Sequence, residues 1–526
     1  MKKKNKNQIH VKPAREYRNS GYSGGGASFE KNVLKTWRPQ HYSVKSDLDL
    51  NLAVLRDRAF DLTINSPLGA AAINTETTGV LGAGLKVFPK LKFKELGLTA
   101  EAAREWARKT KLEFEMWCNS LDCDYYRRNN FYELQRIIFM SYLTDGDAFC
   151  LFKRRFKTGT PYTLRLQVIE AQRVSNPLDG VTNAGISQIE MVRLNNNHRI
   201  INGIEVDAQG RLVAIWVSNR IWNEPLATEP ETKWQRVRMF GKETGERNIL
   251  HVCYDTRAEQ FRGAPFLAPV IETLKQISRY GDAELTSAVI KSFFSIFFVQ
   301  PLSNFEFNDI LPNEENDLPV VDVRKYSLGS GTISALPRGV DVKAIDRSNA
   351  QSTFDPFMTS FIKQIGAALN IPYEILTKQF QASYSASRAA LLQAQDEFRI
   401  RKESFVNDFC QPVYEAFLTE AIAQGRIKAN GFFDDPLKKF LWCAADWRNE
   451  QTHTLDPTKG VEAAIMKIDA GLSTRAKEAV ELGGTDFWEN IEQLELENKS
   501  IDKVTIKPPE ENPNGNKTTS NKSNPK

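Results

Sequence analysis

The amino-acid sequence predicts a mainly helical α+β fold, and three observations support this. Amphipathic runs bounded by helix-start and helix-stop residues fill both ends of the chain. Short apolar runs typical of strands occupy the middle, between residues 148 and 217. A turn-rich stretch, 301–348, then separates two groups of helices. With 526 residues, 41% of them hydrophobic and 26% charged, the chain can build a sizeable core.

The first helices are bounded by recognisable caps. Ser66 and Pro67 suit the N-cap and first helical position, so they predict a helix start. Gly82 to Gly84 predict its end, because glycine disfavours helix continuation. Asn130 and Glu133 have the spacing of a capping box. The predicted helices span residues 47–65, 67–80, 99–118 and 131–143.

Strands are predicted next, and helices then return. Residues 207–210 predict a hairpin turn between the last two strands. Pro412 is expected to kink or split a long helix that Gly425 ends. The predicted strands span residues 148–154, 164–170, 200–206 and 211–217, and the later helices span residues 265–298, 353–369, 386–424, 457–470 and 485–497.

The positive charge of the chain lies in its two ends. Residues 1–45 hold 11 Lys or Arg and 2 acids, and residues 500–526 hold 5 Lys and 3 acids. Subtracting +9 and +2 from the net +5 leaves −6 for residues 46–499. Tight wrapping of duplex DNA requires a basic body, because phosphate neutralisation supplies most of that affinity. The composition argues against such wrapping. Both ends are expected to be disordered.

The sequence predicts neither a membrane anchor nor a disulfide framework. The longest apolar run, 289–299, contains Lys291 and is too short to span a bilayer. No apolar segment follows the first lysines, so a secretory signal is not expected. The six cysteines are scattered, and Cys118 and Cys123 have no second pair to complete a zinc site. Structural thiols and a reducing compartment are expected.

Motifs for catalysis or cofactor binding are not evident. The chain has no phosphate-binding loop of the G-x-x-x-x-G-K-[ST] type and no H-E-x-x-H motif. We interpret 145–147 (Asp-Gly-Asp) as a turn, although its carboxylates could hold a divalent metal. His251 is interpreted as a core histidine, and Trp442 and Trp447 as packing residues. No catalytic residue, metal site or cofactor is predicted.

Several stretches, taken together in their order and spacing, resemble those of a known family. These stretches are 66–85, 130–135, 203–216, 251–271, 280–285, 371–377, 384–392, 412–415 and 456–459. On these stretches, the chain resembles the portal proteins of tailed bacteriophages, lambda-like family, over about 48–490. It differs at Gly281, where a charged residue is usual, at Ala386, which replaces a Ser, and in the acidic 313–317 segment.

The resemblance implies a portal fold with wing, stem, clip and crown regions, assembling into a dodecameric ring around a DNA channel. The implied regions are a disordered basic arm at 1–46, a wing at 47–264, a stem helix at 265–299, a clip at 300–349, a helix, tunnel loop and long helix at 350–425, a crown at 426–498 and a disordered tail at 499–526.

Candidate site residues follow from this mapping. The family motif of the tunnel loop and the helix behind it corresponds to Pro372, Tyr373, Glu374, Tyr384, Ser385 and Arg388. The candidates to approach DNA in the channel are Lys378, Gln379 and Gln381 in the loop and Lys275, Arg279 and Lys291 on the stem. Alternatively, the stem cations pair with the neighbouring acids Glu272, Asp282 and Glu284.

The resemblance also implies partners. These are further copies of the chain, double-stranded DNA in the channel, the terminase large subunit, head-completion or connector proteins, the scaffold and the major capsid protein, with no membrane. The expected location is the virion, at a capsid vertex, after assembly in the host cytoplasm. Because the chain has no phosphate-binding loop, the resemblance assigns ATP hydrolysis to the terminase.

Two other function classes remain open at this stage. A metal-dependent DNA-processing enzyme would use Asp145 and Asp147 as ligands and the basic arm to grip nucleic acid. A monomeric adaptor or scaffold protein would form no closed ring and would tolerate changes in residues 371–392.

Overall fold

The computed structural model describes residues 28, 31–177, 192–193, 197–221, 232–293, 297–299, 341–343, 354–380, 383–449 and 457–503. The chain divides into two units, Met1–Asn51 and Leu52–Lys526. Most of the predicted basic arm, nearly all of the predicted clip and the last 23 residues of the predicted tail lie outside the described residues. The described part of the first unit contains a π-helical turn, η1 (Lys45–Asp49).

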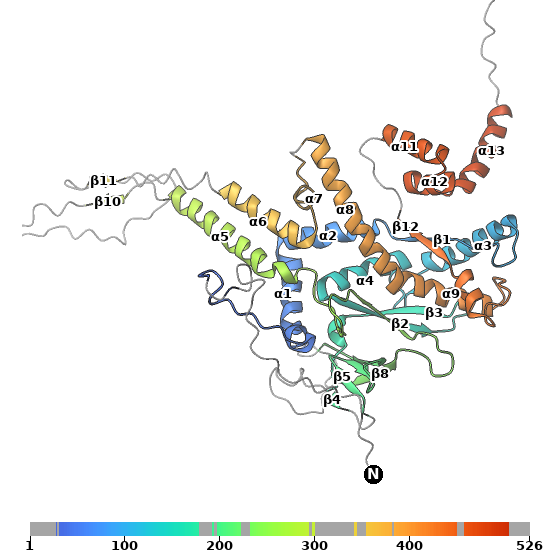
Figure 1. The fold of residues 1–526 in the computed structure, drawn as a ribbon, viewed down its shortest axis with the longest axis horizontal. Coiled ribbons are helices and arrows are strands. Elements are labelled where there is room, and N and C mark those ends of the chain that lie inside the picture. The colour runs from blue at the N-terminus through green and yellow to red at the C-terminus, as the bar shows by residue number, and fades with distance from the viewer. Residues whose placement is uncertain are drawn as a thin grey trace, which may run out of the picture. The chain divides into compact units, whose positions relative to one another are not determined.

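The second unit is mainly helical, as the sequence predicts (Figure 1). Its α-helices are α1 (Leu52–Asn65), α2 (Pro67–Leu81), α3 (Ala100–Asn119), α4 (Phe131–Asp145), α5 (Ile271–Phe293), α6 (Phe354–Leu369), α7 (Tyr373–Thr377), α8 (Tyr384–Phe405), α9 (Gln411–Ala423), α10 (Pro436–Trp442), α11 (Pro457–Asp469), α12 (Arg475–Gly483) and α13 (Phe487–Lys503).

The predicted caps form. The Ser66 hydroxyl accepts a hydrogen bond from the Gly69 amide at 3.3 Å, with Pro67 as the first residue of α2. At the start of α4, the Asn130 side chain accepts from the Glu133 amide at 2.9 Å, and the Glu133 carboxylate accepts from the Asn130 amide at 2.8 Å. These bonds satisfy amides that the helix cannot pair internally, which stabilises both starts.

The strands form four small sheets within the described residues. Their orders are β3-β2-β9, β4-β5-β6-β7-β8, β1-β12 and β10-β11, and all paired neighbours are antiparallel. The strands are β1 (Lys86–Pro89), β2 (Asp147–Arg154), β3 (Leu164–Ile169), β4 (Val192–Arg193), β5 (Arg199–Ile201), β6 (Ile204–Val206), β7 (Leu212–Ser218), β8 (Trp234–Arg238), β9 (Ile249–Cys253), β10 (Phe297–Val299), β11 (Asp341–Lys343) and β12 (Ala445–Arg448).

The prediction of a single strand over 200–206 is wrong. Asn202 and Gly203 have positive φ angles of 46° and 83°, so the chain turns back between β5 and β6. A Cβ on Gly203 would lie 2.6 Å from the Ser175 amide nitrogen, so this close turn requires glycine. The predicted hairpin at 207–210 does form, and it joins β6 to β7.

The helix predicted over 265–298 is shorter than expected. A 3₁₀ turn, η5 (Ala268–Val270), precedes α5, and β10 occupies the end of the predicted range. Phe297 pairs with Lys343 across β10 and β11, so the two ends of the intervening segment meet. Apart from 341–343, the region predicted as the clip lies outside the described residues.

The long helix predicted over 386–424 is split, as Pro412 suggested. A π-helical turn, η9 (Val406–Cys410), separates α8 from α9, and Pro412 stands in the first turn of α9. Gly425 has a φ of 73° just beyond the end of α9. The sequence prediction omitted α7, α10 and α12, which have 5, 7 and 9 residues.

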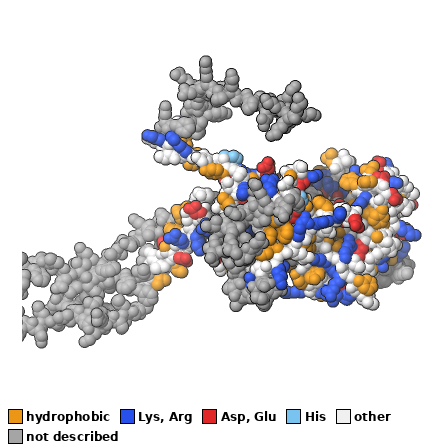
Figure 2. All heavy atoms as spheres, turned by 90° about the horizontal axis from the view of Figure 1, so that it is seen from below, with side chains coloured by type: hydrophobic (Ala, Val, Ile, Leu, Met, Phe, Trp, Pro, Cys, Tyr) orange, Lys and Arg blue, Asp and Glu red, His pale blue; other side chains and the backbone are white. Residues whose placement is uncertain are grey.

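One large core joins α1 to α9 with the β3-β2-β9 sheet. Trp442 and Trp447 are buried in this core, as predicted. All six cysteines are free, and five of them are buried. Among the described residues, no helix is long and apolar enough to cross a bilayer. Figure 2 shows Lys and Arg side chains interspersed with hydrophobic and acidic ones over the face in view.

Candidate functional site

The predicted tunnel loop follows a tight connection between α6 and α7. Asn370 has a φ of 57°, and the Ile371 amide donates to the Gly366 carbonyl at 2.9 Å. A Cβ on Gly366 would lie 2.5 Å from the Ile371 carbonyl oxygen, so this return needs glycine. Pro372 is the N-cap of α7, and the buried Leu376 fixes this short helix in the core. The connection therefore gives the loop a rigid start.

The loop leaves the core at Lys378. This residue ends α7 with a left-handed backbone, φ 57°, and its amide donates to the Glu374 carbonyl. Lys378 and Gln379 are exposed, as the prediction requires, whereas Gln381 lies outside the described residues. On the far side, the Ser383 hydroxyl accepts from the Ala386 amide at 3.4 Å and caps α8. The loop therefore joins two helix ends with its basic residue in solvent.

The family-motif residues divide into two groups. Pro372, Tyr373 and Glu374 are half-buried at the start of α7, and the Lys363 ammonium lies 5.6 Å from the centre of the Tyr373 ring. Ser385 and Arg388 are exposed in the first turns of α8, and the Tyr384 side chain lies outside the described residues. The first group thus lies where α7 begins, and the second where α8 begins. A role in DNA contact stays a prediction for the loop candidates Lys378, Gln379 and Gln381.

The stem candidates lie on α5, which runs beside α6 (Figure 1). Tyr280 packs between these helices, with ring centres 5.5 Å from Phe354 and 4.7 Å from Phe357. Lys275 and Arg279 are exposed, and the Lys291 side chain lies outside the described residues. The predicted pairing with neighbouring acids is not seen for Lys275, whose ammonium lies 4.0 Å from Asp61 of α1. Within α5, Glu272 instead accepts from Gln276 at 3.0 Å.

A buried carboxylate fixes the chain just before α5, and the sequence prediction missed this role. The Asp147 carboxylate is fully buried and accepts from Arg56 at 2.7 Å and from Arg262 at 2.6 Å. His251 adds a contact at 3.2 Å, so α1, β2, β9 and the segment before α5 meet at one group. Arg262 also donates to the carbonyls of residues 171, 174 and 202. The spacing of these residues in the sequence gives no signal of this network.

Charge explains why Asp147 stays ionised. Burial alone would raise its pKa, but Arg262 and Arg56, with a hydrogen bond to His251, hold the pKa well below its usual range. Burial lowers the pKa of Arg56 to about 10, and the nearby positive charge of Arg262 adds to this effect. The pKa of the neighbouring Asp145 rises to about 6, mainly because it is buried. A single carboxylate is therefore the shared counterion of two buried guanidinium groups.

This arrangement argues against a metal at 145–147. Gly146 ends α4 with a φ of 90°, so the turn interpretation is confirmed. The Asp147 oxygens already accept from two arginines, whose positive charge would repel a cation. His251 packs on the Phe149 ring at 4.5 Å and is a core histidine, as predicted. Within the described residues, no group of three potential ligands could hold a metal ion.

The helix behind the loop packs closely on α2. A Cβ added to Gly79 of α2 would lie within 2.6 Å of the Phe398 ring of α8. One turn away, the fully buried Glu76 forms an ion pair with Arg401 of α8 at 3.5 Å, but neither of its oxygens has a hydrogen-bond partner within the described residues. Burial raises the pKa of Glu76 to about 7, although Arg401 opposes this rise. The α2–α8 contact thus contains a buried titratable group whose oxygens have no hydrogen-bond partner among the described residues.

The profile of the family described as "Phage portal protein, lambda family" matches residues 30–402, about 71% of the chain. The chain belongs to the lambda family of phage portal proteins. The match includes the Asp147 network, α5, α7 and most of α8, so the expected family and mainly helical α+β fold are confirmed.

Similar proteins agree with this family. Portal protein B of Escherichia phage lambda is 24% identical over 94% of this chain and 92% of its own length. The portal protein of Escherichia phage N15 is 23% identical with the same coverage of both chains. The chain is also similar to a protein in the neck of a native GTA particle, solved with C12 symmetry, with a TM-score of 0.41, 12% identity and coverage of 82% of this chain and 92% of that one.

Family membership establishes the general role. The chain is a ring-forming portal of a virion, acting at the capsid vertex. The family is a structural, non-enzymatic component of the particle. The monomeric adaptor hypothesis is therefore not retained.

Proposed function

We propose that twelve copies of this chain close a dodecameric ring whose axial channel carries double-stranded DNA during genome packaging and ejection. The observation that carries the proposal is the family match over residues 30–402, which includes the candidate channel elements α5, α7 and α8. A closed ring needs two different complementary faces on each subunit rather than a catalytic pocket. The excess of acids in residues 46–499 also favours sliding, because each phosphate contact would slow the DNA.

The proposed regions follow the fold. The wing would be 47–264, the stem 265–299, the clip 300–349, the helix, tunnel loop and long helix 350–425, and the crown 426–498. Pairing of β10 with β11 supports the clip assignment, because it closes an insertion between the adjacent helices α5 and α6. The rigid start and exposed basic end of α7 support the tunnel-loop assignment.

The remaining partners are part of the same proposal. The terminase large subunit would dock on the clip and supply ATP hydrolysis, and head-completion or connector proteins would replace it after packaging. Scaffold and major capsid protein would contact the wing, with assembly taking place in the host cytoplasm. We propose no catalytic activity for the chain itself, and the engaged Asp147 carboxylate supports this.

The ring is tested by native mass spectrometry and negative-stain imaging of the purified full chain at moderate salt. Closed rings of twelve subunits with an axial hole are expected. Rings of another subunit number would overturn the dodecamer. A chain that stays monomeric even when scaffold protein is added would overturn the proposed ring.

The loop is tested by deleting Gln379 to Ala382 and, separately, by Lys378→Gly, which keeps the left-handed backbone and removes the ammonium. Rings should form normally, whereas DNA packaging or retention in heads should fall. The control is Lys109→Gln, which removes an ammonium at an exposed position of α3. Glutamine is used there because glycine would weaken the helix. Normal genome-filled heads from the deletion variant would contradict the tunnel-loop assignment.

A further inference from the structure

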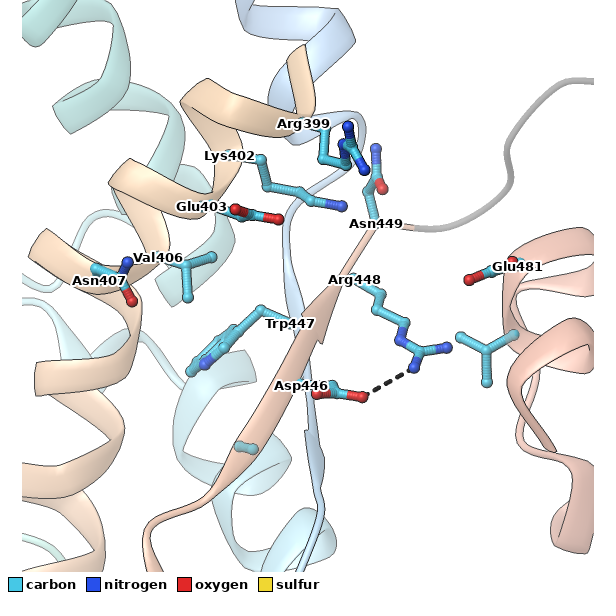
Figure 3. A pocket seen from close by; sticks show the side chains of 12 residues that line it. Arg399, Lys402, Glu403, Val406, Asn407, Asp446, Trp447, Arg448, Asn449 and Glu481 are labelled. Carbon is cyan, nitrogen blue, oxygen red and sulfur yellow. Dashed lines mark hydrogen bonds and ion pairs between the residues drawn. The ribbon is translucent and has the colours of Figure 1, made fainter. Parts of the chain in front are cut away.

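A pocket of about 520 Å³ lies between the C-terminal part of α8, η9, β12 and α12 (Figure 3). Eight of its twelve lining residues have polar side chains. Three cations, Arg399, Lys402 and Arg448, contribute to it, together with the amides of Asn407 and Asn449. Three acids, Glu403, Asp446 and Glu481, also line the pocket.

The acids of the pocket have other partners or contact solvent. Asp446 accepts from Arg448 at 2.9 Å and from Lys90 at 3.2 Å. Glu481 lies 3.8 Å from Lys477, its neighbour one turn away on α12. Glu403 is exposed, so water solvates its charge. Arg399 pairs with Asp396, which does not line the pocket, at 3.1 Å, and Arg448 pairs with Asp446, so Lys402 is the lining cation without a direct counterion among the described residues.

Lys402 is the clearest unsatisfied group. It is half-buried, and no hydrogen bond or ion pair connects its ammonium to any residue that the structure describes. Figure 3 shows its side chain extending from α8 toward β12, with Arg399 and Asn449 at the same end of the pocket. Arg448 adds a second unsatisfied donor, because its Nη1 is buried without an acceptor among the described residues.

The electrostatics of Lys402 reflect this environment. Burial lowers its pKa, and the positive charges of Arg448 and Arg399 lower it further, against the opposing Glu403 and Glu481. A charged ammonium held beside two guanidinium groups is stabilised by an anion, which would supply the missing acceptor.

We propose that this pocket is a phosphate-binding site, in which Lys402 and Arg399 contact the phosphate oxygens and Asn449 donates its amide. Arginine and lysine together are the usual ligands of phosphate groups. Arg448, whose Nη1 is buried, stabilises the phosphate by its charge and does not contact it. The volume exceeds that of one tetrahedral ion and is within the range of small-molecule sites. It accommodates free phosphate, a nucleotide or one backbone phosphate of DNA.

The proposal is tested on the full chain with two probes at constant ionic strength, inorganic phosphate and a short DNA duplex. The readouts are calorimetric affinity and the rate of Lys402 acetylation, measured by mass spectrometry. Bound phosphate should slow acetylation of Lys402 at least fivefold. Lys402→Met should weaken binding at least tenfold without loss of folding, because the ammonium has no partner to lose. Lys109→Met, on α3, should leave affinity unchanged.

The two probes distinguish the sources of the phosphate. Protection of Lys402 by inorganic phosphate supports a site for free phosphate or nucleotide, and protection by the duplex alone supports a backbone phosphate. Absence of protection by either probe overturns the proposal. Equal affinity of wild type and Lys402→Met for the probe that binds also overturns it. None of these outcomes depends on ring closure, so the proposed function is tested separately.

Discussion

Arg56 of α1 donates to the Asp147 carboxylate at 2.7 Å, with both side chains buried and 91 residues apart in the chain. Arg262, just before the stem, donates to the same carboxylate at 2.6 Å. One negative charge thus joins the first helix of the second unit to the segment that leads into α5. Because removal of one member leaves the others charged and buried, the network should dominate local stability.

Asp147→Asn should therefore destabilise the chain strongly. The substitution keeps an oxygen acceptor but leaves two buried guanidinium groups without a counterion, at a cost of about 3 kcal/mol. Urea unfolding of the purified chain measures this change. Asp396→Asn is the control, since its pair with Arg399 is exposed on both sides and should contribute little. Equal stability of wild type and Asp147→Asn would contradict the account of the network.

The same pair predicts a pH dependence. A carboxyl group whose folded pKa is depressed stabilises the fold above its unfolded pKa, and this contribution is lost as pH falls toward the folded value. The difference in unfolding free energy between wild type and Asp147→Asn should thus be constant near neutrality and shrink below about pH 4. Urea titrations at several pH values measure it. A difference that does not change down to pH 3 would contradict the low pKa.

Glu76 should show the opposite dependence. Its folded pKa of about 7 lies above the ordinary value of 4.5, so its contribution to stability is present below pH 4.5 and is lost as pH rises through 7. Glu76→Gln should match wild type at pH 4.5 and be more stable at pH 8, by on the order of 3 kcal/mol.

Thermal unfolding at both pH values tests this prediction. Glu397→Gln is the matched control, because it removes the other partner of Arg401, which lies 3.1 Å away at a less buried position. This control should gain no stability at pH 8. A Glu76→Gln variant that is less stable than wild type at pH 8 would show that Glu76 is ionised and well paired.

Two glycines near the stem should respond in opposite ways to alanine. A Cβ on Gly263 would lie 1.8 Å from the Gly146 carbonyl oxygen, so Gly263→Ala should lower the thermal midpoint or the soluble yield sharply. Gly281, inside α5, has no atom within 4 Å of an added Cβ. Gly281→Ala should therefore stabilise the chain by about 0.5–1 kcal/mol through higher helix propensity. Loss of stability in Gly281→Ala would indicate a contact that the subunit alone does not contain.

The sequence predicted those features that depend on neighbouring residues. The Asn130–Glu133 capping box and the helix start at Ser66 form because each needs only three or four adjacent positions. The turn at Asn202 and Gly203 was missed because the apolar residues on both sides continue a strand pattern. Short helices such as α7 have too few residues to show a helical period, and contact with the core determines them.

The candidate site divides in the same way. The structure places Lys378, a residue of the predicted tunnel loop, in solvent at the end of α7, and its contact with DNA stays a prediction. The partners of Asp147 lie 91, 104 and 115 residues away, and nothing in their spacing identifies them. The pairing of Lys275 with Asp61 was likewise missed, since the acids on α5 itself are nearer in sequence. Long-range charge pairing requires the fold.

The exposed apolar face of the stem helix should be needed for ring formation. Leu274 and Ile277 are buried in the first half of α5, whereas Leu285 and Val289, one turn apart, are 67% and 46% exposed. Such exposed apolar pairs are typical of interaction surfaces, and packing between neighbouring stems in a ring would cover them.

Leu285→Lys should therefore leave the stability of the single chain unchanged and shift the protein from rings to smaller species. Native mass spectrometry measures this shift, with Leu285→Met as the control that retains an apolar side chain. If Leu285→Lys forms rings in the same yield as Leu285→Met, the stem face does not contribute to the subunit contact.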